Sequence, residues 1–515
     1  MLAAETAAFR GGKIGGVADV VHGASRALHA RGWRVDVLIP GHAAVLDHVG
    51  QRRSEGVVAI GSFRPTEVAI ESVLLPCNSG SIRYLLLRHP LFEANGIYSD
   101  DGPMNPFATD ATKYALFCLA AGEALCDGVI ARPEVLHLHD WHAAAFLAFR
   151  GILPRWRGLA RLHTVFTIHN LAIQGIRPFA GVPSSLDNWL PRIRFDRSSL
   201  ADPRWPDCFN PMAAAIRKAD RVHTVSPSYA REIIRPNSDG PVVSHGGEGL
   251  EADLQSADVQ GRLHGILNGC DYPARLPRRT SWANFLRIAN DAVRRWASRT
   301  RDLRSAHYFA AQRLAALSRK RPRMILDSVG RLVAQKAELF LGPASGGKVA
   351  IRALLDAMAD NELLIILGSG DVEFEARFTE FAATEQRLLF LCGYDELLAD
   401  ELYRQGDLFL MPSSFEPCGI SQMLAMRAGQ PCVAHAVGGL RDTISHEVTG
   451  WLFDGSDLTD QADNFVAAVA AARTTFHRNP DGFRAMRREA ARQRFDWAST
   501  AQSYERLLYS TPTVA

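Results

Sequence analysis

Two cations in the C-terminal half have the types and spacing of a site for a charged leaving group. Arg331 and Lys336 stand five residues apart after a predicted strand, so one loop and the next helix start can present both. A guanidinium binds phosphate through a planar fork of donors, whereas an ammonium acts as a point charge. The pair therefore suits the charge that develops on a departing diphosphate. Two solvated surface cations are the alternative.

A glycine-rich segment near the N-terminus offers a second place for an anion. Residues 11–16 (GGKIGG) precede a predicted helix, 18–31, and glycines let backbone N–H groups approach an anion at a helix N-terminus. The spacing of a Walker phosphate loop is absent. A glycine-rich turn with a solvated Lys13 is the alternative.

Histidines and acids gather at predicted strand ends. His137 and His139 fall on one face of the predicted strand 135–139, Asp140 follows it, and His142 lies beyond its end. These residue types allow three interpretations, namely a metal site, structural histidines, or a sugar site centred on Asp140. His169 ends another apolar run, where a satisfied core histidine is the alternative to a functional one.

The elements that must position these residues alternate along the chain. Apolar runs at 35–40, 135–139, 165–169, 221–225, 363–367, 388–392, 408–412 and 431–434 predict strands, and 18–31, 112–126, 348–358 and 420–428 predict helices. Strands alternating with helices indicate an α/β fold with parallel sheets covered on both faces. Such sheets bind ligands at the carboxyl ends of their strands.

Composition limits the function classes. The 515 residues, 47% hydrophobic and 22% charged, predict two or three globular domains and exclude a disordered or fibrous chain. A net charge of +3 argues against nucleic acid or an anionic membrane as the main partner. The eight cysteines form no CxxC pair, and neither a membrane span nor a signal peptide is evident, so we predict a cytoplasmic protein.

The series of strands breaks between 272 and 323. Residues 282–320 show only helical periodicity, with too little apolar content for a core of their own. We therefore predict linker helices at a junction between two α/β halves, with a small separate domain as the alternative.

Nine motifs occur in one order: 13–21 (KIGGVADVV), 139–142 (HDWH), 166–170 (FTIHN), 219–227 (ADRVHTVSP), 266–269 (ILNG), 330–336 (GRLVAQK), 368–371 (GSGD), 415–419 (FEPCG) and 438–440 (GGL). Together they resemble the bacterial glycogen synthase and plant starch synthase family of retaining glucosyltransferases. The likeness spans nearly the whole chain and is weakest between 272 and 323.

The resemblance implies a GT-B fold, with two Rossmann-like doubly wound parallel-sheet domains facing across a cleft. It places a glucan-acceptor domain at 1–272, completed by a C-terminal helix at about 493–515, junction helices at 273–322, and a nucleotide-sugar domain at 323–492. It implies neither a cofactor nor a metal. The family begins with a strand of which only Met1 and Leu2 remain here, so we also expect the natural start to lie upstream.

The resemblance also assigns roles to individual residues. It gives catalytic roles to His169, Glu416, Arg331, Lys336 and Asp140. It gives substrate-binding roles to Lys13, Gly16, Asp19, Asn268, Tyr394, Cys418, Gly419, Ile420, Ser421, Gly438 and Gly439. As a lone feature Glu416 could be only a helix cap, and Tyr394, matched to an aromatic that stacks on the base, could be a core tyrosine.

The implied reaction transfers glucose from ADP-glucose to the nonreducing end of an α-1,4-glucan with retention of configuration. Leu424 stands where sucrose- and trehalose-type relatives carry a second glutamate, which favours the glucan synthases. Departures at Ile14, Ala213 and Ala337 keep open a related transferase with UDP-glucose or another acceptor. A non-catalytic glucan-binding homologue is the alternative from another class.

Overall fold

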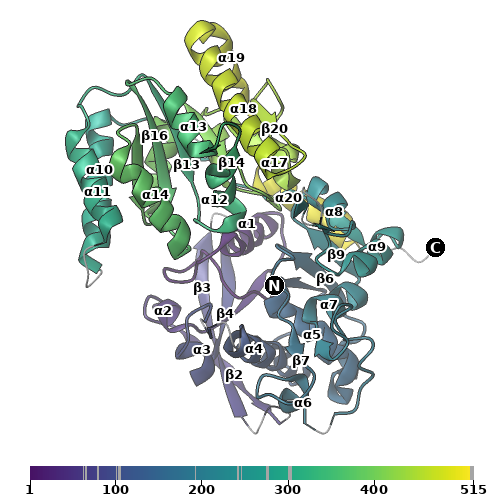
Figure 1. Cartoon of the computed structure of the whole chain (residues 1–515). Helices are drawn as coiled ribbons and strands as arrows, with labels where there is room; N and C mark the ends of the chain where they lie inside the picture. Colours follow the sequence, from purple (N-terminus) through teal and green to yellow (C-terminus); the bar gives the residue numbers. More distant parts are fainter. Residues whose placement is uncertain are drawn as a thin grey trace. The chain divides into compact units, whose positions relative to one another are not determined.

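The computed structural model describes residues 1–61, 63, 66–77, 80–99, 101–102, 106–191, 193–239, 243–244, 246–273, 278–299 and 304–510. The chain divides into two compact units (Figure 1). Unit 1 comprises Met1–Asn237, Gly246–Asp271 and Asp496–Ala515, and unit 2 comprises Ser238–His245 and Tyr272–Phe495.

Unit 1 is built on two groups of four strands. One is parallel in the order β12-β9-β6-β5, and the other has the order β1-β4-β3-β2. Their bounds are β1 Asp36–Pro40, β2 Arg53–Ile60, β3 Thr66–Cys77, β4 Gly80–Arg88, β5 Val135–His139, β6 His163–Ile168, β9 Arg221–Thr224 and β12 Leu263–Gly265. Leu2 joins the groups, because it pairs in parallel with Leu38 of β1 and Leu138 of β5. The antiparallel pairs β2–β3 and β3–β4 were not among the predicted strands.

Helices surround these strands. Their bounds are α1 Gly16–Ala30, α2 Ala43–Leu46, α3 Pro90–Glu93, α4 Ala108–Cys126, α5 Trp141–Ile152, α6 Leu186–Trp189, α7 Pro211–Lys218, α8 Pro227–Glu232, α9 Glu251–Val259 and α20 Trp497–Tyr504. The predicted C-terminal helix packs on α1, where a Cβ at Gly23 would lie 2.1 Å from the Trp497 ring. Only glycine permits this approach, and Trp497, Tyr504 and Leu508 of the C-terminal segment are buried. Residues 511–515 of the predicted segment lie outside the described part.

Unit 2 contains a six-stranded parallel sheet in the order β17-β16-β13-β18-β19-β20. The bounds are β13 Met324–Val329, β16 Glu362–Gly368, β17 Leu388–Cys392, β18 Leu408–Met411, β19 Cys432–His435 and β20 Gly450–Phe453. Successive side chains enter opposite cores, Ile325 on one face and Leu326 on the other. The prediction of a parallel sheet covered on both faces is confirmed here.

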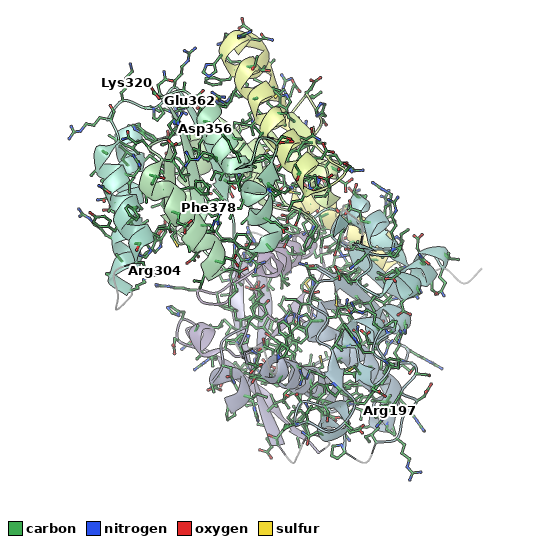
Figure 2. All side chains as sticks on the ribbon, viewed as in Figure 1. Arg197, Arg304, Lys320, Asp356, Glu362 and Phe378 are labelled. Carbon is green, nitrogen blue, oxygen red and sulfur yellow. The ribbon has the colours of Figure 1, made fainter. Side chains whose placement is uncertain are left out.

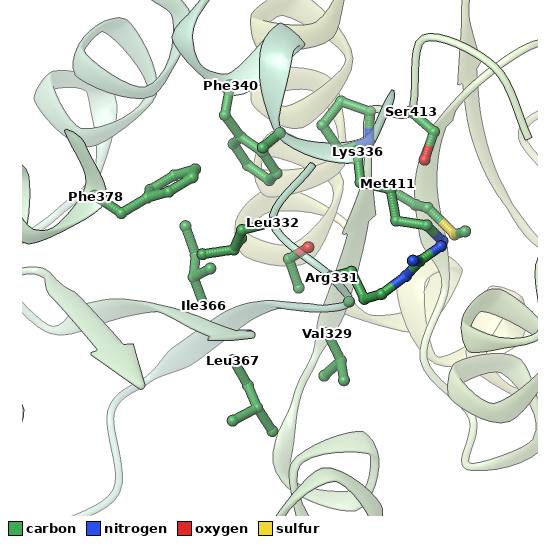
Figure 3. Close-up of a pocket in the computed structure, with 14 residues that line it drawn as sticks. Val329, Arg331, Leu332, Lys336, Phe340, Ile366, Leu367, Phe378, Met411 and Ser413 are labelled. Carbon is green, nitrogen blue, oxygen red and sulfur yellow. The ribbon is translucent and has the colours of Figure 1, made fainter. Parts of the chain in front are cut away.

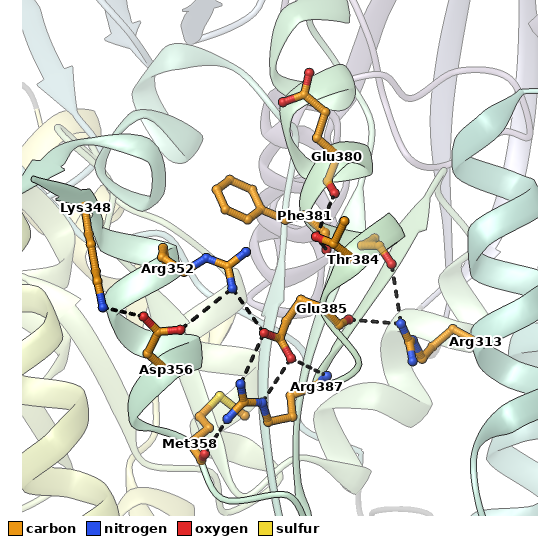
Figure 4. Close-up of polar contacts among 11 residues, drawn as sticks. Arg313, Lys348, Arg352, Asp356, Met358, Glu380, Phe381, Thr384, Glu385 and Arg387 are labelled. Carbon is orange, nitrogen blue, oxygen red and sulfur yellow. Dashed lines mark hydrogen bonds and ion pairs between the residues drawn. The ribbon is translucent and has the colours of Figure 1, made fainter.

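The helices of unit 2 cover both faces of that sheet. They are α10 Trp282–Arg299, α11 Ser305–Ala316, α12 Ala334–Leu341, α13 Ala350–Ala357, α14 Val372–Thr384, α15 Glu396–Gln405, α16 Ser421–Arg427, α17 Gly438–Thr443, α18 Leu458–Arg478 and α19 Pro480–Arg492. Figure 2 shows charged side chains such as Lys320 on the outside, while Phe378 is fully buried. At one edge Glu385 accepts hydrogen bonds from Arg352 and Arg387 (Figure 4).

The segment predicted as a junction, 273–322, is grouped with unit 2. Phe285 and Trp296 of α10 and Leu314 of α11 share one apolar cluster with Ile365 of the sheet. The segment has no core of its own because its apolar face packs against the core of the sheet. Its residues 274–277 and 300–303 lie outside the described part of the chain. No helix of the described residues has the length and apolarity to cross a membrane.

Candidate active site

The predicted site residues fall into two groups, one in each unit, and each group is described within its own unit. In unit 2 the group begins where β13 ends. Arg331 follows Val329 and Gly330, is exposed, and makes no hydrogen bond or ion pair with any described residue. It lines a small pocket with Lys336, Met411 and Ser413, and its side chain reaches toward Met411 (Figure 3). Its guanidinium is available to an anionic ligand.

Lys336 is paired within the protein. Its Nζ lies 2.9 Å from Oε2 of Glu416, which also accepts a hydrogen bond from the Ser413 hydroxyl at 3.1 Å. Glu416 is only 6% exposed, so these two partners carry its charge. Gln335 donates to the carbonyl of Phe415 at 2.9 Å and fixes the start of α12 against this loop. The fold therefore brings Lys336 and Glu416 together as an ion pair.

Two glycines bring α17 against the Glu416 loop. A Cβ at Gly438 would lie 2.0 Å from the carbonyl oxygen of Glu416, and one at Gly439 would lie 2.2 Å from that of Cys418. The Gly439 N–H donates to the Glu416 carbonyl at 3.0 Å. Packing of backbone on backbone accounts for both glycines without a ligand. The predicted substrate contacts of Gly438 and Gly439 remain a prediction.

The loop from Cys418 to Ser421 leads into α16. Gly419 has φ +74°, a left-handed conformation that favours glycine, and Ile420 is the residue before the first helical position, Ser421. Cys418 is buried. The structure thus places the four predicted residues directly after Glu416, in the turn that starts the helix.

Tyr394 lies after β17, at the same edge of the sheet. Its side chain is 59% exposed, which excludes the core-tyrosine interpretation. Its backbone carbonyl accepts a hydrogen bond from the Trp296 indole at 3.1 Å, and Gly393 packs against that indole ring. An exposed aromatic ring is able to stack on a nucleotide base. The stacking role of Tyr394 stays a prediction.

In unit 1 the glycine-rich loop is closed by an acid that the sequence analysis missed. The carboxylate of Glu5 accepts the N–H groups of Ile14 at 2.6 Å and Gly15 at 2.9 Å, and the Tyr98 hydroxyl donates to it at 3.1 Å. Burial raises the pKa of Glu5, and these donors lower it. The prediction that these loop amides serve an outside anion is wrong for Ile14 and Gly15. An acid shortly before a glycine-rich loop was the available signal.

Other parts of this loop stay accessible. Lys13 Nζ lies 2.7 Å from Oδ1 of Asp19, in a pair that is about one-third exposed on both sides. A Cβ built on Gly16 meets no atom within 4 Å, and its φ is ordinary. The fold itself does not require glycine at position 16. A ligand that approaches the start of α1 would require it.

Asp140 has a strained backbone and a buried carboxyl. It follows β5 with φ +63° and ψ −177°, a conformation that is rare outside glycine and clusters at functional sites. Burial raises its pKa to about 8, although the N–H groups of Trp141, His169 and Asn170 oppose the shift. Its Oδ1 is enclosed and finds no partner among the described residues.

The histidines form a buried group behind Asp140. His137 stacks on His139 at 4.3 Å between ring centroids, and Nδ1 of His139 lies 3.1 Å from Nε2 of His169. Burial lowers the pKa of His169 to about 3, so its ring is neutral. Both nitrogens of His137 are occupied, by the Tyr509 and Thr167 hydroxyls, which rules it out as a metal ligand. Among the described residues no group of three His, Cys, Asp or Glu could hold a metal ion.

Asn268 completes the unit 1 group. It lies three residues after β12 and is buried, and its Oδ1 has no partner in the described part of the chain. Asp140, His169 and Asn268 follow β5, β6 and β12, three strands of one parallel sheet. They therefore share the carboxyl edge, where such sheets bind ligands.

Comparisons with known proteins show which family the chain belongs to. A model of the starch synthase catalytic domain matches residues 1–256, and a model of glycosyl transferases group 1 matches residues 314–471. A glycogen synthase of Streptococcus equi subsp. equi (strain 4047) is 31% identical over 98% of this chain and 97% of its own length. One of Streptococcus pneumoniae (strain Hungary19A-6) is 31% identical over 99% and 98%. The chain belongs to the glycogen and starch synthase family.

Solved structures give the fold. The catalytic domain of starch synthase IV from Arabidopsis thaliana, bound to ADP and acarbose, matches with a TM-score of 0.74 and 26% identity over 98% of this chain and 97% of that one. Sucrose-phosphate synthase from Thermosynechococcus elongatus matches with a TM-score of 0.54 and 18% identity over 96% and 92%. The predicted GT-B class and the assignment as a glycosyltransferase are confirmed.

Proposed function

We propose that the protein transfers glucose from ADP-glucose to the nonreducing end of an α-1,4-glucan, with retention of configuration. The observation that carries the proposal is the exposed Arg331, which has no partner among the described residues and lies beside the Lys336–Glu416 pair at the carboxyl edge of the unit 2 sheet. Full-length similarity to glycogen synthases, and to a starch synthase bound to ADP and acarbose, supports it.

In unit 2 the proposed roles follow from charge. The guanidinium of Arg331 grips the diphosphate, and Lys336 adds a point charge as the leaving group gains negative charge. Glu416 binds donor glucose hydroxyls with the acceptor capacity left after its bonds to Lys336 and Ser413. Cys418, Gly419, Ile420 and Ser421 lie near the phosphates, Gly438 and Gly439 behind them. Tyr394 stacks on the base.

In unit 1 the proposed roles follow from the loop and the strand ends. Lys13 and Gly16 approach the diphosphate and sugar, and Asp19 binds a sugar hydroxyl once it is released from Lys13. Asp140, His169 and Asn268 contact the donor glucose. The acceptor hydroxyl attacks the anomeric carbon as the bond to the phosphate breaks, and the leaving phosphate itself takes the hydroxyl proton, so no side chain has to act as the general base. Neither a metal nor a cofactor takes part.

One assay distinguishes the proposed function from two alternatives, namely transfer from UDP-glucose and glucan binding without transfer. Purified protein is incubated with glycogen and either ADP-glucose or UDP-glucose, and glucose incorporation is measured. We expect a higher kcat/KM with ADP-glucose, and incorporated glucose that β-amylase releases as maltose. Comparable or higher kcat/KM with UDP-glucose would overturn the donor assignment, and glucan binding without transfer would favour the non-catalytic homologue.

We also propose that the protein acts in the cytoplasm. None of the eight cysteines is part of a disulfide bond in the described structure. Reduced thiols are what a reducing compartment maintains.

A further inference from the structure

His139, the first residue of the HDWH motif, has no role in the proposed function. His139 is fully buried, in the last position of β5, and so touches no solvent. Its Nδ1 lies 3.1 Å from Nε2 of His169, and the two rings stack with centroids 5.4 Å apart and planes 27° apart. The ring of His137 stacks on that of His139 with centroids 4.3 Å apart. The ring of His139 thus contacts two other histidine rings and directs its Nδ1 at one nitrogen of His169.

The other nitrogens of the pair show which partner donates. Nε2 of His139 is enclosed and has no hydrogen-bond partner among the described residues. If Nε2 of His169 donated to Nδ1 of His139, the single proton of the neutral His139 ring would have to lie on its Nε2. That Nε2–H would be buried without an acceptor. Buried N–H groups without acceptors are rarer in proteins than buried acceptors without donors. The favoured arrangement is therefore a proton on Nδ1 of His139, donated to Nε2 of His169.

The bond determines the chemistry of His169. A neutral imidazole carries one proton, so a ring that accepts at Nε2 carries it on Nδ1. Nδ1 of His169 makes no hydrogen bond with a described residue and is not among the enclosed polar atoms. This open nitrogen is the one that a ligand at the carboxyl edge of the sheet can reach.

We propose that His139 is a positioning residue that fixes the tautomer of His169, so that His169 meets the donor sugar as an N–H donor and not as a base. The proposal rests on the proposed function for the identity of the ligand. The tautomer itself does not depend on it.

The test uses two substitutions of nearly equal shape. In His139→Asn the side-chain amide stands where Nδ1 stood and can still donate, whereas His139→Leu fills the same space without a donor. We expect the Leu variant to lose about tenfold to a hundredfold in kcat, the scale of one misplaced hydrogen bond in the transition state, with a smaller change in KM for ADP-glucose. The Asn variant should keep kcat within about threefold of wild type.

A control separates positioning from packing. His163→Leu removes a 2.7 Å hydrogen bond from His163 to the carbonyl of Leu508, on the neighbouring strand and away from His169. We expect it to lower Tm while leaving kcat unchanged. Equal losses of kcat in the Asn and Leu variants of His139, or none in either, would overturn the proposal.

The tautomer is read directly with [15N]histidine in two-bond 1H–15N spectra of the full chain, with His169 assigned from its absence in His169→Gln. We expect the wild-type proton on Nδ1 and a shift toward Nε2 in His139→Leu. A wild-type proton on Nε2 would refute the proposal even if transfer is active. If no transfer is detected, the proposed function fails and the spectrum still decides the tautomer.

Discussion

Alanine substitutions of Arg331 and Lys336 should have different effects on stability, although both side chains are proposed to face the same diphosphate. Arg331 is exposed and has no partner among the described residues, so Arg331→Ala removes nothing that the folded state uses. We expect a change of less than about 0.5 kcal/mol in the free energy of unfolding. Its kcat should fall by roughly 100- to 1000-fold, on the order of 3 kcal/mol in the activation barrier.

Lys336→Ala should cost stability as well as activity. Among the described residues, it leaves the buried carboxylate of Glu416 with only the Ser413 hydroxyl as a partner. Removing one partner of a fully buried pair costs about 3–5 kcal/mol, and because Lys336 is partly exposed we expect about 1–3 kcal/mol in the free energy of unfolding. Combining Lys336→Met with Glu416→Gln removes both charges and should restore most of the stability but none of the activity.

The assays are denaturant unfolding of each variant, and kcat and KM with ADP-glucose and glycogen. Arg331→Lys should rescue only in part, because an ammonium cannot reproduce the planar fork. The double variant Arg331→Ala with Lys336→Ala should lose less kcat than the sum of the single losses if both act on one phosphate charge. Should folded Arg331→Ala keep more than about half of wild-type kcat at saturating donor, Arg331 is a solvated surface cation and the clamp is refuted.

Three further outcomes follow from the site. Gly16→Ala should leave the free energy of unfolding unchanged, because the space around it is open, but should raise KM for ADP-glucose about tenfold or more. Gly50→Ala, at an equally open glycine outside the glycine-rich loop, should change neither quantity. Asp140→Asn should abolish most activity yet stabilise the protein. The stabilisation should grow as pH rises from 3.8 to about 8, because folded wild type keeps the Asp140 proton that the unfolded chain releases. A difference in Tm between variant and wild type that does not change with pH would contradict this. Because the site residues are divided between two units, ADP with a glucan should compact the protein in small-angle scattering, and an unchanged radius of gyration would count against closure.

The strands and their ends could be predicted because local pattern determines them. Apolar runs gave β16 and β17 to within a residue, since a strand covered on both faces needs an uninterrupted apolar sequence, and the alternating sequence VLHLH gave β5 with the same bounds. Polar residues directly after those runs indicated Asp140 and its neighbours. The antiparallel strands β2 and β3 carry mixed, partly exposed sequences, so their burial pattern is less regular and no run marks them.

Contacts between distant residues could not be predicted from the sequence. Whether an N–H of the glycine-rich loop is free depends on the carboxylate of Glu5, and whether α10 is a linker depends on the sheet it packs against. The pairing of Lys336 with Glu416 likewise joins two motifs that are 80 residues apart. Spacing shows that these residues could act on one ligand, but not which of them is already satisfied inside the fold.

Two buried polar groups at the carboxyl edge of the unit 1 sheet have side-chain oxygens without partners in the described part of the chain. Buried polar atoms in proteins nearly always have partners, yet among the described residues Oδ1 of Asp140 and Oδ1 of Asn268 have none, and both lie at the carboxyl edge of one sheet. Asp140 adds a strained backbone and a carboxyl that burial keeps protonated up to about pH 8. Such costs persist where an external group repays them, because a fold without that need would relax them by substitution. A sugar, which presents several hydroxyl donors and acceptors at once, would satisfy both oxygens without bringing in a charge.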